Sequence, residues 1–171
     1  MGLFSMFKSD TGAQMTPHLA FAIALLYGMR SDGEMDPEEV GHLLSVLGGA
    51  NEGGAIGVGA NNRALLDRAV QYVQRNSPDQ FLAEATPLLS DGQKLCILAN
   101  LLDSALADGQ PEPEEQRLFE QMQRAFGIGD AQLQAIFQVI SLKNDRTVFT
   151  NAQHPHNQPG FSVQLGGGKA A

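Results

Sequence analysis

A segment near the start of the chain recurs in its second half, and this repeat constrains the fold more than any other feature of the sequence. A shift of 76 residues places residues 19–39 on residues 95–115, with identical residues at eight of the 21 positions. Each copy contains an apolar stretch followed by an Asp-Gly-x-x-(Asp/Glu)-Pro-Glu-Glu motif. Such self-similarity predicts two helix-loop-helix repeats related by a pseudo-twofold axis, with their acidic loops near one another.

Apolar residues follow the spacing of an α-helix in several parts of the chain, and no segment alternates in the way that a strand requires. The clearest helical stripes begin at Val40, Leu66, Leu98 and Leu133. A polar residue before a proline marks a helix start after Thr16, Asp36, Ser77 and Glu112. We therefore predict an all-α fold, a compact bundle of about seven helices, at residues 17–31, 37–48, 62–76, 78–86, 91–107, 113–126 and 130–142.

The chain length of 171 residues fits a single domain with an ordinary hydrophobic core. We expect an N-terminal extension at 1–15, a helical domain at 16–144 and a flexible C-terminal tail at 145–171, where Asn, Gln, Pro and Gly dominate. Within the domain, six of the twelve residues from Gly48 to Gly59 are glycine, which predicts a flexible loop at 48–60.

The charge of the chain excludes some classes of partner. A formal net charge of -8 repels a phosphate backbone, and no cluster of basic residues is present, so we expect no nucleic-acid binding. The apolar run from Leu19 to Tyr27 is too short to span a membrane, and no signal peptide opens the sequence, which favours a cytoplasmic location. Cys96, the only cysteine, lies in an apolar stretch, and we expect it to pack in the core.

Most of the carboxylates lie around the two repeated motifs. Residues 31–52 and 103–120 together hold twelve of the nineteen Asp and Glu residues and a single arginine. Asp36 and Glu39 have the spacing of a helix capping box, so part of the motif has a purely structural explanation. Asp32 and Asp108 lack one, because a carboxylate near the last turn of a helix is unfavourable beside the negative end of the helix dipole.

Two interpretations of these loops stay open at this point. In one, the carboxylates bind a cation, and oxygen ligands without cysteine or histidine favour Ca²⁺ or Mg²⁺. In the other, the acidic residues cap helices and face solvent, or attract a basic protein partner without any metal. An enzyme is not expected, because no nucleophile is paired with a base and no poised pair of carboxylates is marked.

The paired Asp-Gly-x-x-(Asp/Glu)-Pro-Glu-Glu loops, each after an apolar helix, resemble those of the TerB family, which is associated with tellurite resistance. The segments 66–73, 93–98 and 142–146 (Leu-Lys-Asn-Asp-Arg) extend the resemblance over residues 16–144. It implies an all-helical TerB-like fold, shared with the N-terminal region of the DjlA co-chaperones. It also implies a metal site formed by both loops, with ligands Asp32, Glu39, Asp108 and Glu115 and secondary candidates Asp36 and Glu112.

The resemblance further implies a cytoplasmic adaptor in tellurite or chemical-stress resistance. Its protein partners would include a membrane-associated stress-response complex, which would hold the chain at the periphery of the inner membrane. The sequence does not predict an oligomeric state. The pair His154 and His156 offers two imidazoles without further ligands nearby in the sequence, so we interpret it as a coincidence of the tail.

Overall fold

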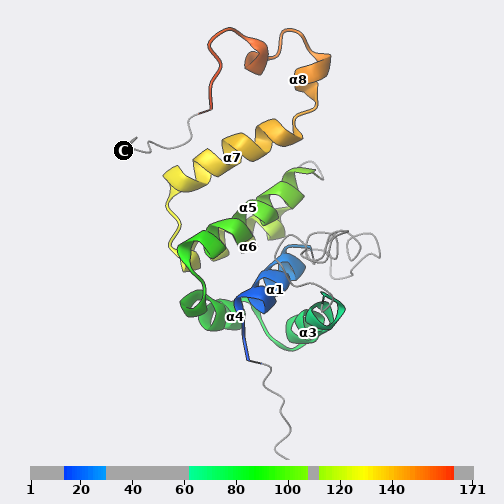
Figure 1. Ribbon diagram of the computed structural model, residues 1–171, viewed down its shortest axis with the longest axis vertical. Helices are drawn as coiled ribbons and strands as arrows, with labels where there is room; N and C mark the ends of the chain where they lie inside the picture. The colour runs from blue at the N-terminus through cyan, green and yellow to red at the C-terminus, as the bar shows by residue number, and fades with distance from the viewer. Residues whose placement is uncertain (1–13, 30–61, 108–111, 164–171) are drawn as a thin grey trace, which may run out of the picture.

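The computed structural model describes residues 14–29, 62–107 and 112–163, which contain seven α-helices and two short 3-10 helices (Figure 1). The α-helices are α1 (Pro17–Met29), α3 (Asn62–Arg75), α4 (Pro78–Ala85), α5 (Asp91–Ala107), α6 (Pro113–Phe126), α7 (Asp130–Asn144) and α8 (Thr147–Thr150). The 3-10 helices are η3 (Thr86–Leu88) and η4 (Pro155–Asn157). These residues contain no strand, and the predicted all-α fold is confirmed.

Six of the seven predicted helices are present, and their ends fall within two residues of the prediction. The predicted helix at 37–48 and the glycine-rich loop lie outside the described residues. Helices α8 and η4 lie in the segment where apolar periodicity predicts no helix. The division into an extension, a domain and a tail stays a prediction, as does the pseudo-twofold axis.

Local signals start the helices where the sequence indicates. The Thr16 hydroxyl accepts a hydrogen bond from the Leu19 amide at 3.2 Å, and the Ser77 hydroxyl accepts one from the Gln80 amide at 3.3 Å. These contacts satisfy amides that have no partner within the first turn of a helix. Prolines at the first position of α1, α4 and α6 add to the same effect, because that position needs no amide donor.

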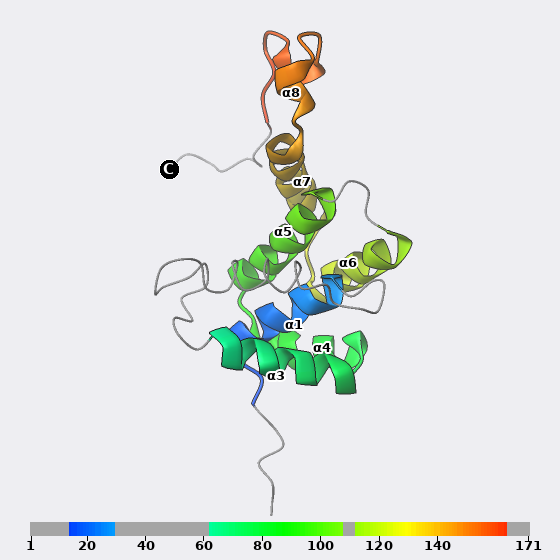
Figure 2. The same ribbon diagram turned by 90° about the vertical axis from the view of Figure 1, so that its right-hand side faces the viewer.

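Helix α1 forms the centre of the core. Every residue from Leu19 to Tyr27 is buried, so this helix is covered on all sides. Helices α3, α4, α5 and α6 contact it, and Figure 2 shows α3 and α5 on either side of it. A helix that is apolar around its whole circumference requires such an enclosed position. No helix of the described residues combines the length and the apolar character needed to cross a membrane.

An aromatic cluster joins α1, α3 and α4. Phe81 is fully buried, and its ring centre lies 5.7 Å from that of Tyr27 and 6.4 Å from that of Tyr72. The Tyr27 hydroxyl donates to the carbonyl oxygen of Asn76 at 2.8 Å, and the Tyr72 hydroxyl donates to Glu84 Oε2 at 2.9 Å. Burial, and then the hydrogen bond to Glu84, raise the pKa of Tyr72 above its usual value.

Helix α7 forms an outer layer on α5, and α8 lies at the end of the molecule opposite α3 in both views. No α7 residue is fully buried, and Phe137 in its apolar stripe is 46% exposed. The layer is fastened by polar contacts, because Asp103 of α5 accepts from Lys143 Nζ at 2.7 Å and from Asn144 Nδ2 at 2.8 Å.

The predicted burial of Cys96 is wrong, because its side chain is exposed. The core face of α5 is formed by Ile97, Leu98, Leu101 and Leu102. Cys96 lies on another face of the same helix, one turn before Asn100, whose side-chain amide donates to the Cys96 carbonyl at 2.8 Å. An unbroken apolar run does not reveal which of its residues face the core.

Candidate functional site

The second acidic motif occupies the break between α5 and α6. Helix α5 ends at Ala107 and α6 begins at Pro113, with Glu112 as the residue that precedes its first turn. The Glu112 amide donates to Glu115 Oε2 at 2.8 Å. Glu115 therefore caps α6 in the way that the structural interpretation of the motif requires.

The other predicted ligands lie outside the described residues. Asp32, Asp36 and Glu39 belong to the segment after α1, and Asp108 directly follows the last residue of α5. Of the six candidates, the structure places Glu112, which is exposed, and Glu115, which is half-buried. A site shared between the two loops therefore stays a prediction.

The two helices that lead into the acidic motifs pack directly on one another. Gly28, in the last turn of α1, faces Leu101 of α5 so closely that a Cβ atom at Gly28 would overlap the Leu101 Cδ2 methyl group. Such a close approach requires a residue without a side chain. It brings the last turn of α1 against the middle of α5, about 9 Å before its end at the helical rise per residue.

One acidic residue near the second motif, Asp103, is paired with a basic residue. Asp103 lies on α5 five residues before Asp108, and its carboxylate binds Lys143 and Asn144 of α7. Asp103 belongs to the acidic cluster in the sequence, but its contact with α7 was not predicted. Its partners, Lys143 and Asn144, belong to the Leu-Lys-Asn-Asp-Arg segment that was noted in the sequence. A contact across 40 residues, however, cannot be located from local spacing.

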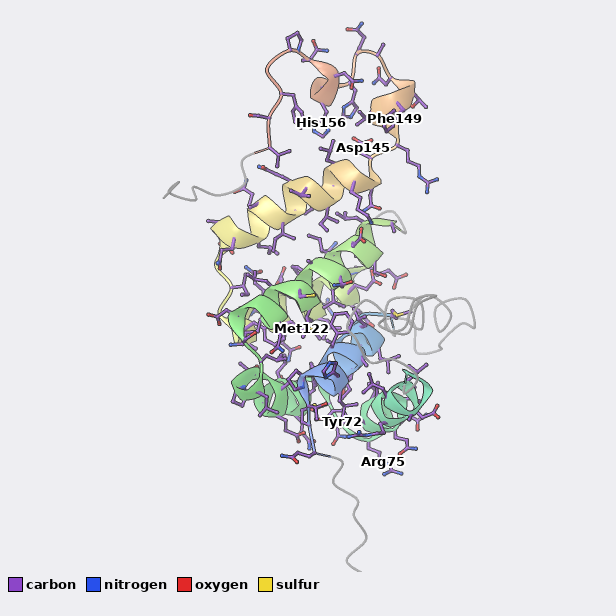
Figure 3. The ribbon with its side chains drawn as sticks, viewed as in Figure 1. Tyr72, Arg75, Met122, Asp145, Phe149 and His156 are labelled. Atoms are coloured by element: carbon purple, nitrogen blue, oxygen red, sulfur yellow. The ribbon has the colours of Figure 1, made fainter. Side chains whose placement is uncertain are left out.

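The structure also brings together three residues that the sequence analysis did not connect. Asp145, His154 and His156 have candidate ligand atoms that all lie within 4.8 Å of one another. Figure 3 shows Asp145 and His156 close together beyond the end of α7. A hydrogen bond from the Thr147 hydroxyl, helped by the Thr147 amide and the two imidazoles, holds the pKa of Asp145 below its usual value.

Residues 18–138 match the family of the tellurite resistance protein TerB. The chain belongs to the TerB family. This match covers well over half of the chain and confirms the resemblance carried by the repeated acidic motifs. Comparison with curated proteins and with solved structures found no match. The TerB match includes both acidic motifs and ends within α7, before Asp145.

Proposed function

We propose that this TerB-family chain is a metal-binding adaptor in tellurite or chemical-stress resistance. A hard divalent cation, Ca²⁺ or Mg²⁺, is held by oxygen atoms of Asp32, Glu39, Asp108 and Glu115. Asp36 and Glu112 are secondary ligands. The role is one of binding rather than catalysis. The chain acts in the cytoplasm and recruits protein partners, among them a membrane-associated complex that brings it to the inner membrane.

The charges at the helix ends carry this proposal. Neither α1 nor α5, the two helices that lead into the acidic motifs, has a basic residue in its last turn. Helices α3, α6 and α7 each have one, namely Arg75, Arg124 and Lys143, while the shorter helices α4 and α8 have none and lead into no acidic motif. Arg30 directly follows α1 in the sequence and lies outside the described residues, whereas the next basic residue after α5 is Arg117. Carboxylates that follow a negative helix end without a basic residue need a positive charge from elsewhere, and a bound cation supplies it.

The donors suit such an ion. Ionised carboxylates accept but do not donate, and hard cations prefer oxygen ligands of this kind. The contact from the Glu112 amide fixes the Glu115 carboxylate at the start of α6, next to the loop that contains Asp108. Capping and metal binding are compatible there, because a carboxylate has two oxygen atoms.

Thermal unfolding of the full chain tests the metal. Wild type is compared with the Asp32→Asn plus Asp108→Asn variant in EDTA, Ca²⁺ and Mg²⁺. At a hundredfold excess of ion over its dissociation constant, binding stabilises the folded state by about 2.7 kcal/mol, which raises Tm by roughly 5–10 °C. We expect the variant to lose this rise and to keep its Tm in EDTA.

A second pair of variants separates capping from metal binding at one residue. Glu115→Gln retains an oxygen that can accept from the Glu112 amide, whereas Glu115→Ala removes it. We expect Glu115→Gln to melt like wild type in EDTA but to respond less to Ca²⁺ or Mg²⁺. Glu115→Ala should be less stable in both conditions.

Copurification from cells, with the acidic loops intact or neutralised, tests the adaptor role. Loss of the same partners from the Asp32→Asn plus Asp108→Asn variant supports it. If neither cation changes Tm while the binding of basic partners still weakens steeply with salt, the loops act by charge alone and the metal proposal is wrong.

A further inference from the structure

A second cluster of candidate ligands follows both acidic loops in the sequence and lies outside the residues that match the family. Asp145 Oδ2 lies 3.0 Å from His154 Nε2 and 3.9 Å from His156 Nδ1. All three side chains are partly buried, with exposed fractions of 23%, 15% and 31% in that order. The cluster is therefore shielded but still accessible to solvent.

The chain holds the carboxylate in a fixed orientation. Asp145 follows the last residue of α7, and its Oδ1 atom accepts from the Thr147 amide at 3.0 Å and from the Thr147 hydroxyl at 2.5 Å. These bonds occupy one oxygen and direct the other towards the two imidazoles. The turn that carries the imidazoles is closed by Asn157, whose side-chain amide donates to the Val148 carbonyl at 2.8 Å.

The His156 ring packs against two other rings. Its centre lies 4.7 Å from that of the His154 ring and 4.4 Å from that of the Phe161 ring. Its Nδ1 atom is shielded from water and has no hydrogen-bond partner in the described residues. A shielded polar atom without a partner is unfavourable and needs an explanation. A bound ligand would give this nitrogen a partner.

We propose that Asp145, His154 and His156 bind a divalent transition-metal ion of the zinc type. Zinc bonds of about 2.0–2.2 Å in tetrahedral geometry place neighbouring donor atoms roughly 3.3 Å apart. The two separations from Asp145 Oδ2, 3.0 and 3.9 Å, lie on either side of this value. Two imidazoles favour a zinc-type ion over Ca²⁺ or Mg²⁺, so this site is chemically distinct from the acidic loops. Water completes the coordination of the ion.

The ion takes the place of a proton. His154 Nδ1 accepts from the His156 amide at 3.1 Å, so the proton of the neutral ring is on Nε2 and faces Asp145. When Nε2 binds the ion, this proton leaves Nε2 and a proton from solvent occupies Nδ1. The ring then no longer accepts from the His156 amide, and that amide changes its hydrogen bonding. Zinc binding therefore has a local signature at a single backbone position.

The test uses the full chain with Cys96→Ser, so that the exposed thiol does not bind the ion. Zinc affinity is measured by competition with a chromophoric chelator, and Co²⁺ serves as a visible-absorption probe. The chain has four histidines, which provides a matched control: His154→Ala plus His156→Ala against His18→Ala plus His42→Ala. We expect the His154→Ala plus His156→Ala variant to bind zinc more than about tenfold more weakly. Loss of a residue that only supports a metal ligand already costs about tenfold, and loss of two ligands should cost more. The control pair should bind like the parent.

Asp145→Asn keeps an oxygen for Thr147 and should weaken zinc binding without changing the helical signal. In the parent protein, Zn²⁺ should shift the amide NMR resonance of His156, whereas Ca²⁺ should not. This readout does not depend on any variant remaining folded. The proposal is overturned if the His156 resonance does not respond to Zn²⁺, or if both histidine pairs bind alike. The zinc proposal is also overturned if zinc affinity depends on Asp32 and Asp108 instead of on the histidines. That outcome would leave the Ca²⁺ and Mg²⁺ test of the acidic loops unaffected.

Discussion

The contact between Gly28 of α1 and Leu101 of α5 provides a sharp test of how the two repeated helices pack. A Cβ atom at Gly28 would overlap the Leu101 Cδ2 methyl group, while Leu101 Cγ would lie at an ordinary 3.8 Å. The overlap thus involves one methyl group at the end of a side chain. Leu101 is only 8% exposed, so this methyl group has little room to move aside.

The expected free energies follow from this geometry. Gly28→Ala introduces an overlap that costs about 1–3 kcal/mol, and the higher helix propensity of alanine offsets about 1 kcal/mol of it. The net effect is a loss of roughly 0–2 kcal/mol. Leu101→Ala alone costs about 2–5 kcal/mol, because it removes a buried side chain. In that background the overlap is absent, so Gly28→Ala should instead stabilise by up to about 1 kcal/mol.

Urea denaturation followed by the helical circular dichroism signal measures the four proteins of this double-mutant cycle. We expect a coupling of about 1–3 kcal/mol between the two positions. Gly92→Ala is the control, because a Cβ atom there would meet nothing within 4 Å and its effect should be the same in both backgrounds. If Gly28→Ala has the same effect with and without the Leu101 side chain, the close packing of α1 on α5 is refuted.

Three further predictions concern single residues. Phe81→Ala should cost about 3–5 kcal/mol in a denaturant titration, whereas Phe149→Ala, at a ring that is 93% exposed, should change stability by less than about 0.5 kcal/mol. Because the pKa of Tyr72 is raised in the folded chain, its contribution to stability is complete below about pH 10 and is lost as the pH rises further. The decline of Tm between about pH 10 and 12 should be smaller in Tyr72→Phe, and an unchanged decline would exclude this residue as the cause. Glu115→Ala should lower the free energy of unfolding by about 0.5–2 kcal/mol through the lost cap, and equal stability of this variant and Glu115→Gln would show that the cap contributes nothing.

The helix boundaries could be predicted from the sequence because their signals are local. Helix α6 begins at Pro113 because Glu112 and Glu115 form a capping pair, and it ends where Gly127 adopts a left-handed backbone with φ 68°. Each of these features depends on residues within one turn of the boundary. The family could be predicted for a related reason, since its motif is a spacing of residues along the chain.

The orientation of α5 and the cluster beyond α7 could not be predicted in this way. Cys96 is exposed because tertiary packing selects one face of an apolar helix, and periodicity does not fix which face that is. Asp145 contacts His154 across eight intervening residues, which have no apolar pattern. Side-chain hydrogen bonds rather than apolar packing hold this segment. The imidazole pair was visible in the sequence, but its third partner was not.

The two repeated helices make similar contacts even where their residues are not identical. Tyr27 and Asp103 are equivalent under the shift of 76 residues, and each fastens its helix to the end of another helix. Tyr27 donates to the carbonyl oxygen of Asn76, directly after α3, and Asp103 accepts from Asn144, the last residue of α7. The two asparagines are 68 residues apart, which is eight fewer than the shift. The glycine-rich stretch between the first motif and α3 accounts for such a difference if it is an insertion. The second copy is then a unit of three helices, α5, α6 and α7, in which the first helix holds the end of the third. In the first copy α1 likewise holds the end of α3, although the residue types that make the contact differ.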